Sequence, residues 1–175
     1  MRTVNVGLIG LGTVGSGVVE ILDRHAEHFR TRAGVDLALV KQARDPAGTL
    51  LPDMAPVSSG QTLYFLLLID NPTAAPASDL RVLDLLDESR FTYLSGTLEQ
   101  ALLPSGSDDA AIWAGSFSPL SDAVGAPDDG GSATDTGGAT GADRITFGAV
   151  PSQANATIEV PAATMWVVRF QVRVN

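Results

Sequence analysis

The sequence contains no cysteine. Disulfide bonds, thiolate metal sites, thiol catalysis and haem attachment through cysteine are therefore excluded. The redox compartment stays undetermined, because chains without disulfides occur on either side of a membrane. Hydrophobic residues make up 45% of the 175-residue chain, which is enough to bury a core in one ordinary domain.

Positive charge is scarce. The net charge is −9, and residues 91–143 carry eight acidic side chains and no lysine or arginine. Such a surface repels phosphate groups, so we expect no nucleic-acid partner. Lys41 is the only lysine in the chain.

Imidazole bases are limited to two residues, His25 and His28. His25 falls on the apolar stripe of a helical pattern, which indicates a packing role, and His28 is expected to be exposed. No serine stands in a G-x-S-x-G turn between a strand and a helix. We therefore expect no catalytic residues and no enzyme.

Long apolar runs are also missing. No stretch reaches the 18 consecutive apolar residues of a membrane span, so we expect none. The apolar segment Thr3–Val19 follows Arg2, and an alternative interpretation is a weak signal peptide. Its glycines, Asn5 and the charged helix pattern directly after it favour a folded segment instead.

The chain begins with a strand pattern at residues 3–9, followed by a G-x-G-x-x-G turn and a helical pattern. The glycines of this turn are Gly10, Gly12 and Gly15. Another strand pattern at Val35–Lys41 would complete a strand–helix–strand unit.

Residues 1–40 resemble the amino terminus of homoserine dehydrogenase in this strand and its GxGTVGSGV turn. The resemblance implies NAD(P) binding, with Gly10, Gly12 and Gly15 letting the backbone approach the pyrophosphate. The rest of that family's cofactor domain and its catalytic lysine and aspartate region are not found after Lys41. A lone fragment of this kind lacks the neighbouring strands that form a nucleotide crevice, so we expect the glycines to serve only as a turn or a flexible segment.

From Gly60 onward the pattern changes to short strands separated by turn residues. These strands and polar loops predict an all-β fold, an antiparallel β-sandwich of seven to eight strands. The expected strands are Gln61–Asp70, Asp79–Leu86, Phe91–Leu98, Ala110–Ala114, Arg144–Val150, Asn155–Val160 and a last strand from Met165 to the end of the chain.

Two expected strands, Gln61–Asp70 and the last strand, have an inward face that the period of a strand indicates. The last strand places its larger apolar side chains on one face and Arg169, Gln171 and Arg173 on the other, which predicts a half-buried antiparallel strand. The residues expected on inward faces are Leu63, Phe65, Leu67, Ile69, Trp166, Val168, Phe170, Val172 and Val174.

Residues 35–175 resemble the Ig-like repeat domain of prokaryotic surface proteins that is catalogued as domain of unknown function number eleven. The resemblance begins with the strand DLALVKQA and ends with the alternating last strand. Its central pattern is met by Gly60, Phe65, Asn71, Ala75, Ala77, Asp84 and Leu86. Phe65 stands where that family usually has tyrosine, and Asp87 stands where it usually has proline. The resemblance implies an Ig-like sandwich and an extracellular or cell-surface location.

Acidic loop residues offer one candidate metal site. Asp108, Asp109, Asp128 and Asp129, with Asp135 and Asp143, could supply oxygen ligands to Ca²⁺. No EF-hand or nonapeptide spacing is present, so the favoured interpretation is a solvated acidic loop without a cofactor. Trp113 and Trp166 are expected to be core or interface residues rather than sugar platforms.

We therefore expect two parts, an amino-terminal extension at residues 1–34 and an Ig-like β-sandwich at residues 35–175. The expected function is a non-enzymatic, extracellular structural module. It would form homo-oligomers or polymers, such as a filament, by pairing strand edges. Two alternatives remain open: an NAD(P)-binding oxidoreductase fragment and a sugar- or protein-binding adhesin domain.

Overall fold

The computed structural model describes residues 38–124, 129–134, 141–149 and 154–175. Gly10, Gly12, Gly15, His25, His28, Asp128 and Asp135 lie outside these ranges, as does the expected boundary between the two parts. The described elements are β1 (Ala38–Arg44), β2 (Thr62–Asn71), β3 (Ala77–Leu80), β4 (Val82–Asp87), β5 (Phe91–Tyr93), β6 (Glu99–Pro104), α2 (Asp109–Trp113), β7 (Ser118–Pro119), β8 (Gly131–Thr134), β9 (Ala142–Phe147), β10 (Ile158–Val160) and β11 (Thr164–Val174).

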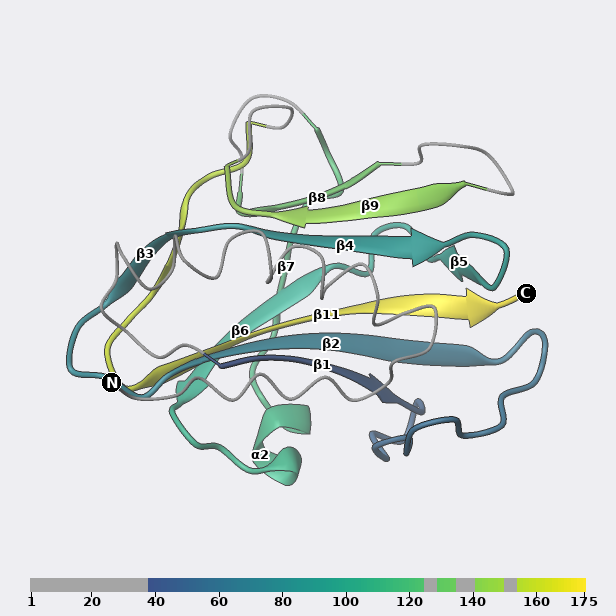
Figure 1. Cartoon of the computed structure of the whole chain (residues 1–175), viewed down its shortest axis with the longest axis horizontal. Helices are drawn as coiled ribbons and strands as arrows, with labels where there is room; N and C mark the ends of the chain where they lie inside the picture. Colours follow the sequence, from purple (N-terminus) through teal and green to yellow (C-terminus); the bar gives the residue numbers. More distant parts are fainter. Residues whose placement is uncertain (1–37, 125–128, 135–140, 150–153) are drawn as a thin grey trace.

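The strands form an all-β, sandwich-like arrangement in which every strand pair is antiparallel, as the sequence predicts. One sheet has the order β1-β2-β11-β6-β7, with β5 also paired to β11. Across from it lie a three-stranded sheet of order β4-β9-β8 and the pair β10-β3 (Figure 1). The described residues thus contain more strands than the expected seven to eight, because several are only two to four residues long.

The main core fills the space between these layers. Alternate residues of β2 and β11 point into it, and the expected inward set from Leu63 to Ile69 and from Trp166 to Val174 is confirmed. The ring of Trp166 meets the ring of Phe147 from β9 edge-on, with centroids 5.5 Å apart. Such aromatic pairs add to the energy of area burial, so this contact helps to join the two layers.

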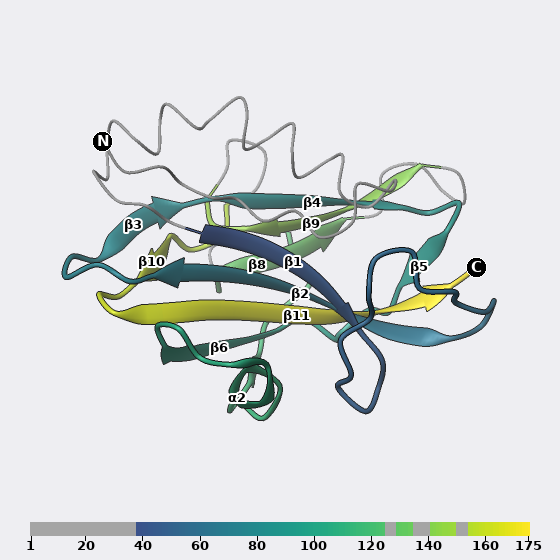
Figure 2. The same cartoon turned by 60° about the horizontal axis from the view of Figure 1, so that its bottom comes forward.

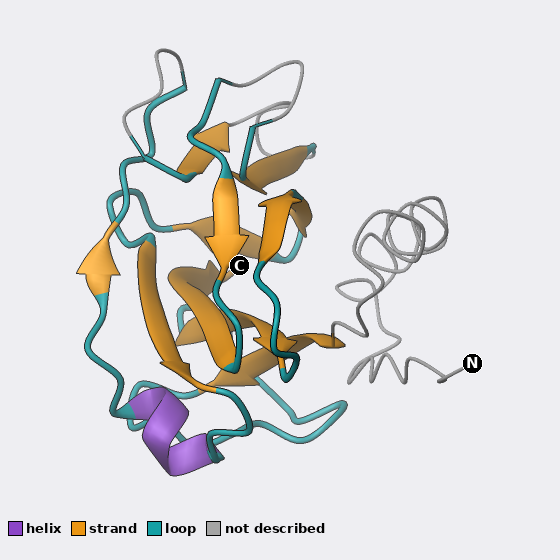
Figure 3. Cartoon of the chain, turned by 90° about the vertical axis from the view of Figure 1, so that its left-hand side faces the viewer, coloured by secondary structure: helices purple, strands orange, loops and turns teal. Residues whose placement is uncertain are grey.

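The opposite face of the large sheet carries a second, smaller core. Leu66 and Leu68 of β2 and Met165 and Val167 of β11 pack against Ile112 of α2. The helix lies on the outside of the large sheet, away from β4, β8 and β9 (Figures 1 and 3). The expectation that β11 is buried on one face only is therefore wrong for its first half and holds toward its end, where Arg173 is exposed.

The expected strand Ala110–Ala114 is wrong, because these residues belong to helix α2. Asp108 is the N-cap of this helix, and its carboxylate accepts a 2.8 Å hydrogen bond from the backbone N–H of Ala111. Aspartate at this position satisfies one of the free N–H groups of the first turn. No helix in the described residues is long and apolar enough to cross a membrane.

Candidate functional site: the faces and the edge of strand β1

Strand β1 is an edge strand of the large sheet and, among the described strands, pairs with β2 (Figure 2). Its side chains alternate between two faces because the period of a strand is two. Leu39 and Ala43 pack against the main core, whereas Val40 packs against the small core under α2. The strand therefore presents three distinct chemical environments: an inner face, an outer face and an edge.

The inner face of β1 holds a buried ion pair. The Nζ of Lys41 lies 2.7 and 2.6 Å from the two carboxylate oxygens of Asp84 on β4. Their side chains are only 7% and 1% exposed. Burying two charges is unfavourable unless the geometry of the pair is very good, and this bidentate contact across the two layers meets that condition.

The surroundings of this ion pair are largely apolar. The ammonium of Lys41 lies 4.8 Å from the centre of the Phe65 ring, which faces the same core. In the register of β4 and β9, Asp84 is opposite Ile145, and Asp143 stands two residues before Ile145. Asp143 is also buried, so a second carboxylate occupies the diagonal position beside Asp84.

The outer face of β1 holds a second buried cation. Arg44 is 2% exposed and donates hydrogen bonds to the side chain of Gln42, to the carbonyl of Gly48 and to Asp109 at the start of α2. It also donates to the backbone carbonyl of Asp109 at 3.2 Å. These contacts fix the helix against the end of β1, which is a structural role.

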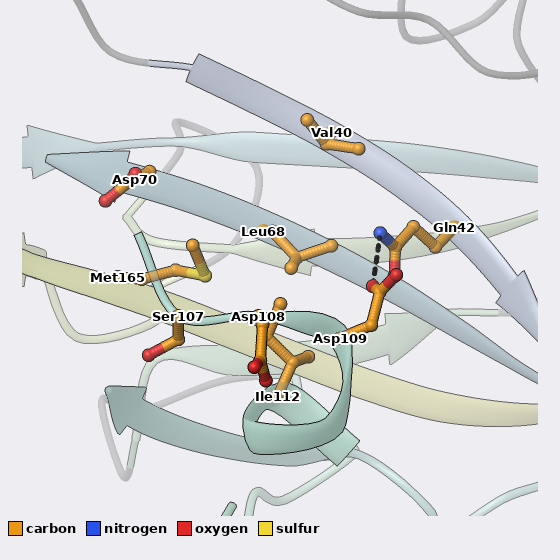
Figure 4. Close-up of a pocket in the computed structure, with 9 residues that line it drawn as sticks. All are labelled: Val40, Gln42, Leu68, Asp70, Ser107, Asp108, Asp109, Ile112 and Met165. Carbon is orange, nitrogen blue, oxygen red and sulfur yellow. Dashed lines mark hydrogen bonds between the residues drawn. The ribbon is translucent and has the colours of Figure 1, made fainter. Parts of the chain in front are cut away.

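A pocket opens between β1, β2, β11 and α2 (Figure 4). Its volume is about 450 Å³, and both apolar and acidic side chains line it. The Oδ1 atom of Asp70 is buried and has no hydrogen-bond partner among the described residues. No basic side chain lines the pocket, and Asp109 is paired with Arg44, so Asp70 and Asp108 are the acids that favour positively charged groups there. The lining residues are Val40, Gln42, Leu68, Asp70, Ser107, Asp108, Asp109, Ile112 and Met165.

The edge of β1 is partly covered. The backbone N–H of Leu51 donates to the carbonyl of Ala43 at 2.9 Å, on the side away from β2. In an antiparallel pair the N–H and C=O of one residue point to the same side, and this side alternates along the strand. The backbone groups of Leu39 and Lys41 therefore also point away from β2, and they form an open edge within the described residues.

Arg169 of β11 forms a cluster near α2 that sequence reasoning missed. Its guanidinium lies 3.7 Å from the centre of the Phe117 ring and 5.3 Å from that of Trp113, and it pairs with Glu99 at 2.7 Å. These contacts satisfy the cation without an external ligand. In the sequence, the only indication of this cluster is an arginine between apolar residues of an alternating strand.

A tyrosine near β5 is held in its neutral form. The hydroxyl of Tyr93 donates to Asp122 at 2.6 Å. Burial, followed by the hydrogen bond to Asp122 and the charge of that carboxylate, raises the pKa of Tyr93 far above its usual value. Since the phenol keeps its proton at physiological pH, it does not supply a nucleophile or a base.

The acidic residues considered for Ca²⁺ have other contacts where they are described. Asp108 caps α2 and Asp109 pairs with Arg44. Asp129 accepts hydrogen bonds from the backbone N–H groups of Ser121 and Gly131. No group of three metal-ligating side chains occurs within the described ranges.

The two tryptophans have different surroundings. Trp166 lies in the main core and donates from Nε1 to Gln100 at 3.0 Å. Trp113 packs partly buried on the small core, where its ring meets Tyr64 edge-on. Both contribute to packing, as expected for residues of a core.

Comparison with known proteins gives one short similarity. The chain is 44% identical to homoserine dehydrogenase from Methylobacillus glycogenes over 43 residues, which is 25% of this chain and 10% of that enzyme. The chain thus spans about a tenth of the length of the relative it matches, and the match loosely supports the resemblance of residues 1–40. No protein-family model matches the chain, so the resemblance to surface-protein repeats has no support from this comparison.

Proposed function

We propose that this chain is a non-enzymatic, extracellular structural module that assembles with copies of itself by strand addition at the edge of β1. The observation that carries this proposal is the edge at Leu39 and Lys41, whose backbone groups point away from β2 and are open as far as the described residues go. Unpaired edge groups are a template for another strand. A lone inward charge on an edge strand would oppose such pairing, but Lys41 is neutralised by Asp84.

The proposed occupant is the amino-terminal extension of a second copy. Residues 3–9 have the β-prone, apolar character of an added strand, and residues 1–34 carry four arginines against three acidic residues. The pocket beside β1 is lined by Asp70 and Asp108, and also by Asp109, whose charge is offset by Arg44. The opposite charges of the extension and the pocket favour their contact.

Replacing Leu39 with proline is expected to reduce assembly. Proline removes one N–H from the open edge and leaves the hydrogen bonds to β2 intact, which is the position where strands tolerate it. Light scattering and negative-stain electron microscopy of the full chain would measure the loss of polymers. Leu39→Ala is the matched control, since it removes the same side chain and keeps the N–H.

Deletion of residues 1–34 tests the occupant separately. We expect the same loss of assembly as with Leu39→Pro. Assembly that survives the deletion would remove the amino-terminal extension from the mechanism, and uniform monomers of the unaltered chain would defeat the proposal as a whole.

Cofactor binding is the second candidate, because the short match to homoserine dehydrogenase favours it. Fluorescence or calorimetric titration of the purified chain with NADH and NADPH tests this candidate. We expect no saturable binding, since residues 1–34 lack the neighbouring strands of a nucleotide crevice. Saturable binding in the micromolar range would instead support a role for Gly10, Gly12 and Gly15.

A further inference from the structure

We propose that the pocket beside α2 binds a small organic cation, an alkylammonium group with a short apolar chain. The pocket lies on the outer face of the large sheet, between β1, β2, β11 and α2, and its volume is about 450 Å³ (Figure 4). This volume is typical of small-molecule sites, which combine apolar walls with a few polar groups. The inference does not depend on the proposed assembly, because it concerns side chains of a single copy.

The strand register explains the apolar part of the pocket. Val40 of β1 is opposite Leu68 of β2. Two residues further along β2, Asp70 is opposite Met165 of β11. Residues two apart on a strand share a face, so all four side chains lie on the outer face of the sheet. Ile112 of α2 packs against the same face, so a hydrocarbon chain in the pocket would exchange water for apolar contacts.

Asp70 is the residue that indicates a cation. Its Oδ1 atom is buried and has no hydrogen-bond partner among the described residues. This oxygen has lost water without gaining a hydrogen bond in return, which is unfavourable for the anion. Asp70 also lines the pocket, and the two oxygens of a carboxylate share its charge. A cation bound in the pocket therefore offsets the loss by its attraction to the whole carboxylate.

The other two acids of the pocket differ in their contacts. Asp109 is paired with Arg44 and also accepts a hydrogen bond from Gln42 at 3.5 Å, so its charge is already offset. Asp108 accepts a hydrogen bond from the backbone of α2 at one of its oxygens, and no basic side chain stands beside it in the pocket lining. Asp108 thus adds to the attraction for a cation, whereas Asp109 does not.

This difference gives the ligand a direction. Figure 4 shows Asp70 at one end of the pocket and the contact between Gln42 and Asp109 at the other, with Leu68 between them. The ammonium is therefore assigned to the end at Asp70, and the apolar chain to the wall at Leu68. The apolar wall favours an alkylammonium over a metal ion, because a metal ion gains nothing from hydrocarbon contacts.

Saturation-transfer NMR of the full chain with n-pentylammonium chloride tests the proposal. The method observes the ligand, so it works on monomers and polymers alike. We expect saturable transfer to the methylene protons, with a Kd on the order of 1 mM because the ligand is small. n-Pentanol and pentanoate keep the chain length and remove or reverse the charge, and each is expected to bind at least about tenfold more weakly. Equal binding of n-pentanol would overturn the proposal.

A free amine and the side chain of a lysine share this chemistry, and a competition experiment distinguishes them. The peptide Gly-Lys-Gly with blocked ends is added to the chain with bound n-pentylammonium. Displacement of the amine would show that the pocket takes a lysine side chain as well. Retention of the amine would restrict the pocket to free amines.

Substitutions locate the binding site. Asp70→Asn removes the charge at constant size and is expected to weaken binding by about tenfold or more. Asp53→Asn is the matched control, because Asp53 is exposed in a turn outside the pocket lining. Ser107→Lys supplies a tethered ammonium at the pocket and should block binding, whereas Ser107→Gln should not. Undiminished binding by Asp70→Asn would overturn the proposal, as would the absence of saturable transfer in the unaltered chain, whatever the folding of the variants.

Discussion

Replacing Asp84 with alanine is expected to lower the free energy of unfolding by about 3–5 kcal/mol. The variant removes the carboxylate that pairs with Lys41, whose side chain is only 7% exposed. The ammonium then stays in the buried site without that ion pair. A buried charge without a partner loses its hydration and gains nothing in exchange. Urea denaturation followed by circular dichroism measures the change.

Asp53→Ala is the matched control for this variant. Asp53 is exposed in the turn before Met54, so the same chemical change should alter stability by less than about 0.5 kcal/mol. Replacing both members of the pair, as in Lys41→Met with Asp84→Leu, should restore much of the loss because no charge remains buried. Equal effects of Asp84→Ala and Asp53→Ala would contradict the assigned role of the ion pair.

The inner faces of the long strands could be predicted from the sequence. Leu63, Phe65, Trp166 and Phe170 alternate with other residues at the period of a strand, and all four lie in the main core. Alternation did not predict that the other face of β2 and β11 is also buried, where α2 covers it. The continuous apolar run around Leu66 is the pattern of a strand buried on both sides, and the sequence did not show what would cover it.

Helix α2 was mistaken for a strand because its five residues are too few to display a helical period. The available signal was the pair of aspartates before the apolar residues, since Asp108 is a favoured N-cap and Asp109 is suited to the first turn. This signal could have been recognised, whereas the packing of the helix on β2 and β11 depends on contacts distant in sequence.

The ion pair between Lys41 and Asp84 could not be derived from the sequence alone. Lys41 is the only lysine, and its position between Leu39 and Ala43 places it on an inward face. Its partner is 43 residues away on a strand of the opposite layer. Alternation predicts which face a residue occupies and does not predict which strands lie across the core from each other.

Strand β1 connects the proposed assembly edge with the buried ion pair. Its edge offers the backbone groups of Leu39 and Lys41, while its inner face is fixed to β4 by the contact with Asp84. A strand added at this edge would pull on β1 when a polymer is stretched. An edge strand that is anchored to the opposite layer carries such a load better than one held by hydrogen bonds to β2 alone.

Replacing Trp166 with alanine is expected to lower the free energy of unfolding by about 3–5 kcal/mol. Trp166 is 3% exposed and contacts Phe147 across the layers, so its removal opens a cavity in the main core. Trp113→Ala is the matched control, with an expected loss of about 1–2 kcal/mol because this ring is only partly buried on the small core. Each variant keeps the other of the two tryptophans as its fluorescence probe in a guanidinium titration.

The two fluorescence transitions also test whether the cores unfold together. Trp166 reports the main core and Trp113 reports the small core beside α2. Both cores share β2 and β11, so the fluorescence change in each variant should coincide with loss of the circular dichroism signal. A transition of Trp113 that precedes the loss of strand signal would show that α2 detaches first, and a larger loss for Trp113→Ala than for Trp166→Ala would contradict the assignment of the main core to the space between the sheets.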